Sequence, residues 1–150
     1  MFAFSIDTVD IKIFMNKLFI QNTFDRLNIR DIKLKTIVTY NIDCTANEHS
    51  PEQPKERFVR WSDVKGFIYA LIKGNRKPSY MKFIFSLAEE DLETINDNAA
   101  AAFINIIYEN DKISGYAGVS QKVFSIGKDV EYKWDKMVEK FLKKNEIPFT

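Results

Sequence analysis

Residues 32–44 give the strongest strand signal in this sequence, because their side chains alternate between two kinds. The alternate positions that begin at Ile32 are largely apolar, and the positions between them are polar except for Ile37. Successive side chains of a strand point to opposite faces of a sheet, so this period predicts a strand with one buried face and one face in water. A wet face favours antiparallel pairing, because parallel sheets are buried on both sides. The inward set is Ile32, Leu34, Thr36, Val38, Tyr40, Ile42 and Cys44.

Leu27 and Ile29, just before this stretch, alternate in the opposite phase. A shift of one residue moves the side chains that follow to the other face of the sheet. We therefore expect a β-bulge or a tight turn near Arg30 and Asp31.

Three segments have the apolar spacing of amphipathic helices. The first follows Asp7, a predicted N-cap. The second begins near Trp61 and is expected to end at Gly74, in a left-handed C-cap. The third covers residues 129–144. The expected apolar face of the first helix is Val9, Ile13, Phe14 and Leu18.

Shorter alternating segments predict the remaining strands, and Asn110 and Asp111 are expected to form a hairpin turn between two of them. Strands and helices do not alternate regularly along the chain. The sequence therefore predicts an α+β fold, with a mainly antiparallel sheet and two or three helices packed on one face. We expect one domain that spans residues 1–150. The further strands are expected at residues 2–6, 81–87, 103–108, 112–120 and 123–126.

The composition narrows the classes of function. A chain of 150 residues with 45% hydrophobic residues matches a single globular domain. The 22 basic and 21 acidic residues nearly cancel, so attraction to nucleic acid would have to come from a local patch. Asp7 and Asp10 interrupt any apolar signal segment, and no apolar run approaches the ~20 residues that span a bilayer. We expect a cytoplasmic protein without a membrane partner.

One cysteine and one histidine exclude an internal disulfide and a cysteine-based zinc site. Cys44 and His49 lie close in sequence, as in a thiol–imidazole pair. Cys44, however, falls in the inward set of its strand, where thiols are usually inert packing residues. The sequence also lacks a phosphate-binding glycine loop. It therefore predicts no catalytic residue, no metal and no cofactor.

Residues 73–82, the basic segment, combine a junction between a helix and a strand with unbalanced charge. The segment contains four cations, one aromatic residue and no acid. Such cations can bind phosphates, and a tyrosine can stack on a base. Cations at the end of a helix also complement its dipole while they face solvent, and this second interpretation stays open. The candidate partner- or anion-binding residues are Lys73, Arg76, Lys77, Tyr80 and Lys82.

Several short segments, spread over most of the chain, carry a family resemblance. They are Val9-Asp10-Ile11-Lys12, Thr23-Phe24-Asp25, Trp61, Leu71-Ile72-Lys73-Gly74 with Pro78, Val123-Phe124-Ser125, Trp134-Asp135-Lys136-Met137-Val138 and Phe141-Leu142. In these segments the chain resembles a bacterial family of conserved domains of unknown function, found largely in anaerobic Gram-positive bacteria. None of them is a catalytic motif. The resemblance implies a self-contained cytosolic domain and supplies no activity.

The sequence thus predicts a non-enzymatic binding or regulatory domain that engages a protein partner through the basic segment and neighbouring sheet edges. One alternative is a nucleic-acid-binding accessory protein, of phage or defence-system origin, that uses the same five residues. Another is an enzyme whose polar groups converge only in the fold. Residues 89–97, the acidic segment, carry five acids and no base, so self-association through the acidic segment of one copy and the basic segment of the next is a further alternative.

Overall fold

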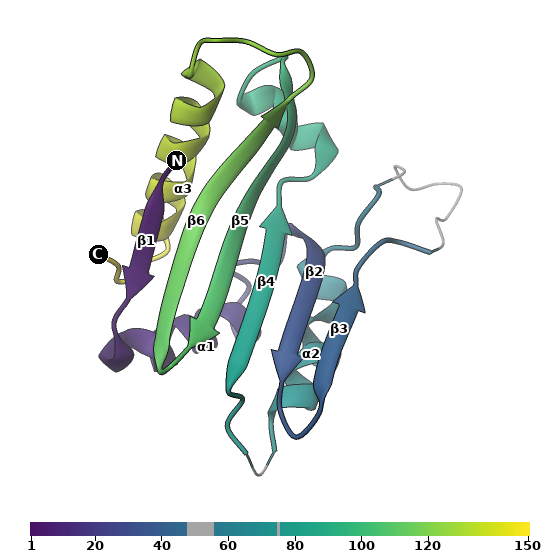
Figure 1. The fold of residues 1–150 in the computed structure, drawn as a ribbon, viewed down its shortest axis with the longest axis vertical. Coiled ribbons are helices and arrows are strands. Elements are labelled where there is room, and N and C mark those ends of the chain that lie inside the picture. Colours follow the sequence, from purple (N-terminus) through teal and green to yellow (C-terminus); the bar gives the residue numbers. More distant parts are fainter. Residues whose placement is uncertain (48–55, 75) are drawn as a thin grey trace.

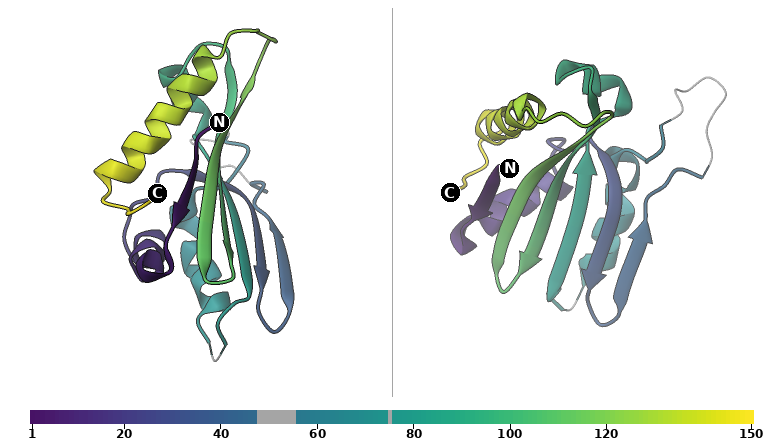
Figure 2. Two further views of the ribbon diagram at one scale, coloured as in Figure 1. Left: turned by 60° about the vertical axis from the view of Figure 1, so that its left-hand side comes forward. Right: turned by 45° about the horizontal axis from the view of Figure 1, so that its top comes forward.

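The computed structural model describes residues 1–47, 56–74 and 76–150. These residues form a six-stranded antiparallel sheet with the strand order β1-β6-β5-β4-β2-β3, and the α-helices lie on one of its faces (Figures 1 and 2). The predicted α+β architecture is therefore confirmed. The elements are β1 (Ala3–Ile6), η1 (Thr8–Asp10), α1 (Ile11–Phe19), β2 (Asn28–Lys35), β3 (Thr39–Asp43), α2 (Trp61–Ile72), β4 (Tyr80–Ser86), η2 (Glu89–Thr94), β5 (Ala99–Glu109), β6 (Lys112–Gln121) and α3 (Asp129–Lys144), where η marks a 3₁₀ helix.

The long alternating stretch at 32–44 is a hairpin and not one continuous strand. β2 ends at Lys35, residues 36–38 form the turn, and β3 begins at Thr39, which pairs with Lys35. With three residues in the turn, paired residues of β2 and β3 are an even number of positions apart. Odd-numbered residues therefore share one face in both strands, and the apolar alternation continues across the turn without a change of phase. Ile37, the one exception in the pattern, lies in the turn and is 78% exposed.

The expected bulge is present at the start of the same strand. Ile29 pairs with Phe85 of β4, whereas Asp31 pairs with the adjacent Ile84, so Arg30 is the extra residue. The bulge explains why the apolar phase changes at this point.

The hairpin between β5 and β6 also agrees with the prediction. Asn110 and Asp111 both have positive φ, 54° and 59°, as a two-residue turn of this kind requires.

The core lies between the helices and the sheet face that they cover. Both tryptophans are buried in it, and each indole donates a hydrogen bond to a main-chain carbonyl. Trp61 Nε1 donates to the Leu18 oxygen at 2.8 Å, and Trp134 Nε1 donates to the Phe103 oxygen at 3.1 Å. None of the helices in the described residues combines the length and the apolar character needed to span a bilayer.

The first helix differs from its prediction. The chain forms the 3₁₀ turn η1 before α1 begins at Ile11, and a 3₁₀ turn has three residues per turn instead of 3.6. The face set by Phe14 and Leu18 is buried, but Val9 is 85% exposed and Ile13 is 44% exposed. The predicted stripe was therefore correct only over its second half.

Two further local expectations were wrong. Gly74 is not a left-handed C-cap, because no described glycine has positive φ, and the chain leaves α2 through Lys73 in an extended conformation with ψ 118°. Residues 123–126 form no strand. The main chain of Val123 is bound by the side chain of Asn98 instead. Asn98 Nδ2 donates to the Val123 carbonyl oxygen at 2.9 Å, and the Val123 N–H donates to Asn98 Oδ1 at 3.0 Å.

Candidate functional site

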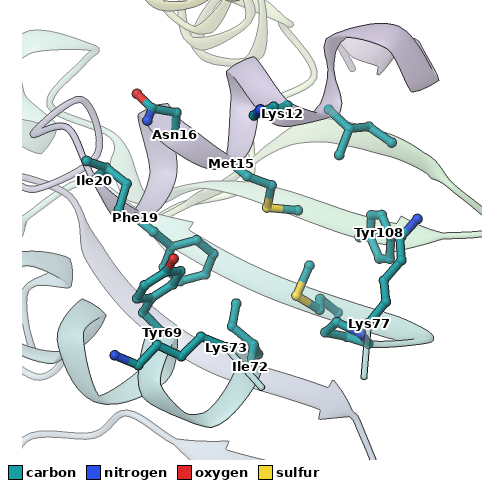
Figure 3. A pocket seen from close by; sticks show the side chains of 13 residues that line it. Lys12, Met15, Asn16, Phe19, Ile20, Tyr69, Ile72, Lys73, Lys77 and Tyr108 are labelled. Atoms are coloured by element: carbon teal, nitrogen blue, oxygen red, sulfur yellow. The ribbon is translucent and has the colours of Figure 1, made fainter. Parts of the chain in front are cut away.

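A groove of about 350 Å³ lies between α1 and α2 on the helix-covered side of the sheet (Figure 3). We call it the lysine groove. Helix α1 forms one wall, helix α2 and the basic segment form the other, and side chains of β4 and β5 complete the lining. It is lined by Ile11, Lys12, Met15, Asn16, Phe19, Ile20, Tyr69, Ile72, Lys73, Lys77, Pro78, Met81 and Tyr108.

The interior of the lysine groove is apolar. Met15 projects from α1 and Ile72 from α2 (Figure 3), and the buried Met81 of β4 also lines the groove. The rings of Phe19 and Tyr69, one from each helix, lie 5.4 Å apart between their centroids. The two helices therefore contact each other through these rings, and the groove opens beside that contact (Figure 3).

Three lysines line the lysine groove, and none of its lining residues is an acid. Lys12 and Lys73 form no ion pair with any described residue, although the Lys73 ammonium lies 5.8 Å from the Tyr69 ring centroid. Lys77 is paired with Asp111, and this hydrogen bond raises the pKa of the Lys77 ammonium. The open positive charge of the groove is therefore carried by Lys12 and Lys73.

The structure divides the five residues that the sequence singled out. Lys73 and Lys77 line the lysine groove, and Arg76 is exposed in the loop between α2 and β4. Tyr80 and Lys82 flank the buried Met81 in β4, so their side chains point to the opposite, helix-free face of the sheet. The basic segment therefore contributes residues to two surfaces, which lie on opposite faces of the sheet.

On that opposite face, Tyr80 and Lys82 join two lysines of the neighbouring strand β2. Lys33 lies directly opposite Lys82 in the β2–β4 register. The ammonium of Lys35 lies 5.3 Å from the centroid of the Tyr80 ring. These four residues, Lys33, Lys35, Tyr80 and Lys82, form the sheet-face patch.

The contribution of α1 to the lysine groove was not predicted. Lys12 and Asn16 are four residues apart, so they lie on one side of the helix beside Met15. The sequence signal was the second apolar row at positions 11, 15 and 19, flanked by these polar residues. It became informative only once the fold placed α1 against α2, which begins 50 residues after α1 in the chain.

The cysteine–histidine hypothesis receives no support from the geometry of Cys44. Its thiol is buried, and burial, followed by the charges of Asp31 and Asp43, raises the pKa of Cys44 to about 11. The thiol is therefore protonated at neutral pH. His49 lies outside the described residues. Within the part of the chain that the structure describes, no three His, Cys, Asp or Glu side chains are placed to hold a metal ion.

The acidic segment lies at the opposite end of β4 from the basic segment, because Tyr80 begins that strand and Glu89 follows soon after its last residue, Ser86 (Figure 1). Glu90 forms an ion pair with Arg60 at 3.1 Å. Glu89, Glu93, Asp97 and Lys122 line a hollow of about 500 Å³ with apolar and amide neighbours. The two segments therefore do not meet within one chain.

The fold defines an α+β domain whose sheet is covered by helices on one face. The chain belongs to the family of unknown function DUF5721, whose model matches residues 17–150. The match begins within α1 and includes the α2 side of the lysine groove, the sheet-face patch and all of α3. A search of curated proteins and a search of solved structures give no significant match.

Proposed function

We propose that this protein is a non-enzymatic binding domain that holds an acidic, partly apolar segment of a protein partner in the lysine groove. The observation that supports this function is the combination of an apolar interior, a lysine on each wall that forms no ion pair with a described residue, and a lining without acids. We further propose that the protein is cytoplasmic and comes from a bacterium of the anaerobic Gram-positive group.

The dimensions of the lysine groove suit a few large apolar side chains. A volume of about 350 Å³ lies at the lower end of the range for ligand sites. An amphipathic helix presents such side chains at intervals of three and four residues, and it can place acids on either side of them. Lys12 on one wall and Lys73 on the other are positioned to meet those acids.

The two kinds of contact contribute differently to binding. Burial of apolar surface is worth about 25 cal/mol per Å², so Met15 and Ile72 supply most of the affinity. An exposed ion pair is worth only about 0–1 kcal/mol, so Lys12 and Lys73 act mainly on orientation and on the choice of an acidic partner.

The sheet-face patch keeps the nucleic-acid alternative as a second candidate. Like charges directly opposite each other destabilise a sheet, and Lys33 faces Lys82 in this way. A bound phosphate would relieve that repulsion. Three lysine–phosphate contacts on a single strand predict a slope of about −2 in log affinity against log salt. Fluorescence polarisation of a labelled single-stranded oligonucleotide between 50 and 200 mM salt measures this slope. Lys82→Gln removes one of the three contacts and should make the slope less steep.

The protein-partner proposal is tested by photo-crosslinking in the native host. Ile20 lines the lysine groove and is 60% exposed, whereas Tyr132 on α3 is 63% exposed and lies outside the groove. A benzophenone amino acid at position 20 should capture a partner that the same group at position 132 does not. Calorimetry with the purified partner should then show that Met15→Glu abolishes binding. Identical products at both positions, or binding that Met15→Glu leaves intact, would contradict the proposal.

A further inference from the structure

Strand β6 is longer than its neighbour β1, and this difference leaves part of its edge open. β1 pairs with β6 from Ile113 to Tyr116, and the last contact is the Ala117 N–H to the Phe2 carbonyl oxygen at 2.8 Å. β6 then continues to Gln121. Val119 and Gln121 have the same parity as Ala117, so their main-chain groups on this side point away from β5. No described residue pairs with them there.

The outer edge of β1, by contrast, is paired at Ser5. Ser5 and Thr150 exchange two main-chain hydrogen bonds, of 3.0 and 2.9 Å, so the C-terminal residue pairs with β1. The last part of β6, residues 117–121, therefore continues beyond β1 with the outward main-chain groups of Val119 and Gln121 unpaired among the described residues. We call it the β6 edge.

A cleft of about 710 Å³ lies along the β6 edge. Met1, two residues before β1 begins, lines this cleft together with residues of the loop between β6 and α3 and of the first turn of α3. Figure 1 shows this loop, which joins the end of β6 to the start of α3. The side of β6 that would accept another strand thus faces a concave space.

The loop beside the β6 edge exposes three large apolar side chains. Val123 is 71% exposed, Phe124 is 87% exposed and Ile126 is 88% exposed. Exposed apolar side chains gathered in this way mark interaction sites. The loop is also anchored where it leaves the strand, because Val123 exchanges hydrogen bonds with the side chain of Asn98. Its apolar side chains are therefore presented beside the strand that would receive a ligand.

The charges around this cleft nearly cancel, unlike those of the lysine groove. Its charged lining side chains are Lys128 and Glu131. The ammonium of Met1, which precedes β1, forms ion pairs with Glu131 and with Asp135 of α3. The cleft therefore favours an uncharged segment.

We propose that the β6 edge is a strand-addition site for an extended, uncharged segment of another protein. Main-chain groups of Val119 and Gln121 would pair with the backbone of that segment, in line with β1. Its alternate apolar side chains would cover Phe124 and Ile126. This site lies outside the lysine groove, and it does not depend on the function proposed for that groove.

A displayed library of random 12-residue peptides, selected on the intact protein, supplies the probe. Synthetic copies of the enriched peptides are then measured by fluorescence polarisation. Val119→Pro removes the main-chain donor at the centre of the β6 edge. We expect it to weaken binding at least tenfold, and Phe124→Ser with Ile126→Ser to do the same. Because these two side chains are exposed, the double variant stays folded even where Val119→Pro does not.

Lys73→Glu is the matched control, since it alters the lysine groove alone. Peptides that lose affinity with Lys73→Glu but not with the β6-edge variants would occupy the groove, and that result would overturn the strand-addition proposal while supporting the proposed function. Failure to enrich any peptide would also overturn it. Sedimentation tests a third contrary outcome. If the protein self-associates and Val119→Pro abolishes that self-association, the β6 edge binds a second copy of this chain and not a different protein.

Discussion

Lys77 and Asp111 form an ion pair that joins the loop after α2 to the turn between β5 and β6. The hydroxyl of Tyr108 donates a second hydrogen bond to the same Asp111 oxygen, at 3.1 Å. Both contacts stabilise the charged carboxylate, and they lower the pKa of Asp111. This arrangement holds Lys77 and Tyr108 at one end of the lysine groove.

The Asp111 carboxylate gives a testable dependence of stability on pH. Since its pKa is lower in the folded state, its contribution is present at neutral pH and is lost as the pH falls below about 4. Asp111→Asn keeps a residue that tolerates positive φ but removes the charge. Urea unfolding should show the variant to be less stable than the native protein at pH 7. The two should converge towards pH 3, and a difference independent of pH would contradict the assignment.

Two glycines should respond in opposite directions to the same substitution. A Cβ at Gly115 would lie 2.3 Å from the Phe4 ring, which is buried and packed against two other aromatic rings, so Gly115→Ala should cost about 1–3 kcal/mol. Gly66 is exposed within α2, with nothing within 4 Å of a Cβ, so Gly66→Ala should stabilise by about 0.5–1 kcal/mol. Urea denaturation measures both changes. Equal effects at the two sites would contradict the packing described for β1 and β6.

The Cys44 thiol should be unreactive in the folded protein. Its pKa of about 11 leaves only about one thiol in a thousand ionised at pH 8, and the side chain is 5% exposed. Iodoacetamide should label the native protein far more slowly than the protein unfolded in urea. Labelling at the same rate in both states would show that the thiol is accessible and would reopen the question of a reactive cysteine.

Much of the fold was predictable because local patterns carried the information. The phase change before Asp31 located the bulge, and Asn110 and Asp111 located a hairpin turn by their tolerance of positive φ. The turn at residues 36–38 was missed because three residues preserve the alternation. Gly74 was misassigned because α2 ends in an extended residue and needs no left-handed cap.

The candidate site was predictable only in part, since its walls come from distant parts of the chain. Charge counting located Lys73 and Lys77, but it could not show that Tyr80 and Lys82 point to the other face. That division follows from where β4 begins, because Tyr80 is its first residue and side chains alternate from there. Lys12 lines the lysine groove only because α1 packs beside α2, and a contact between elements so far apart in the chain cannot be predicted from a local sequence pattern.

The charge of the lysine groove can be tested without knowing its partner. Anilinonaphthalene sulfonate is an aromatic anion whose fluorescence increases in apolar surroundings, so it matches an apolar groove lined by Lys12 and Lys73. Lys12→Glu with Lys73→Glu should raise its half-saturation concentration about fivefold, equivalent to about 1 kcal/mol. Met15→Glu should remove most of the signal, because it places a charge in the apolar interior. Lys133→Glu with Lys140→Glu, at two exposed positions of α3, makes the same change in net charge and should change little. If Phe124→Ser with Ile126→Ser removed the signal instead, the dye would be bound beside the β6 edge, and the lysine groove would have no demonstrated preference for anions.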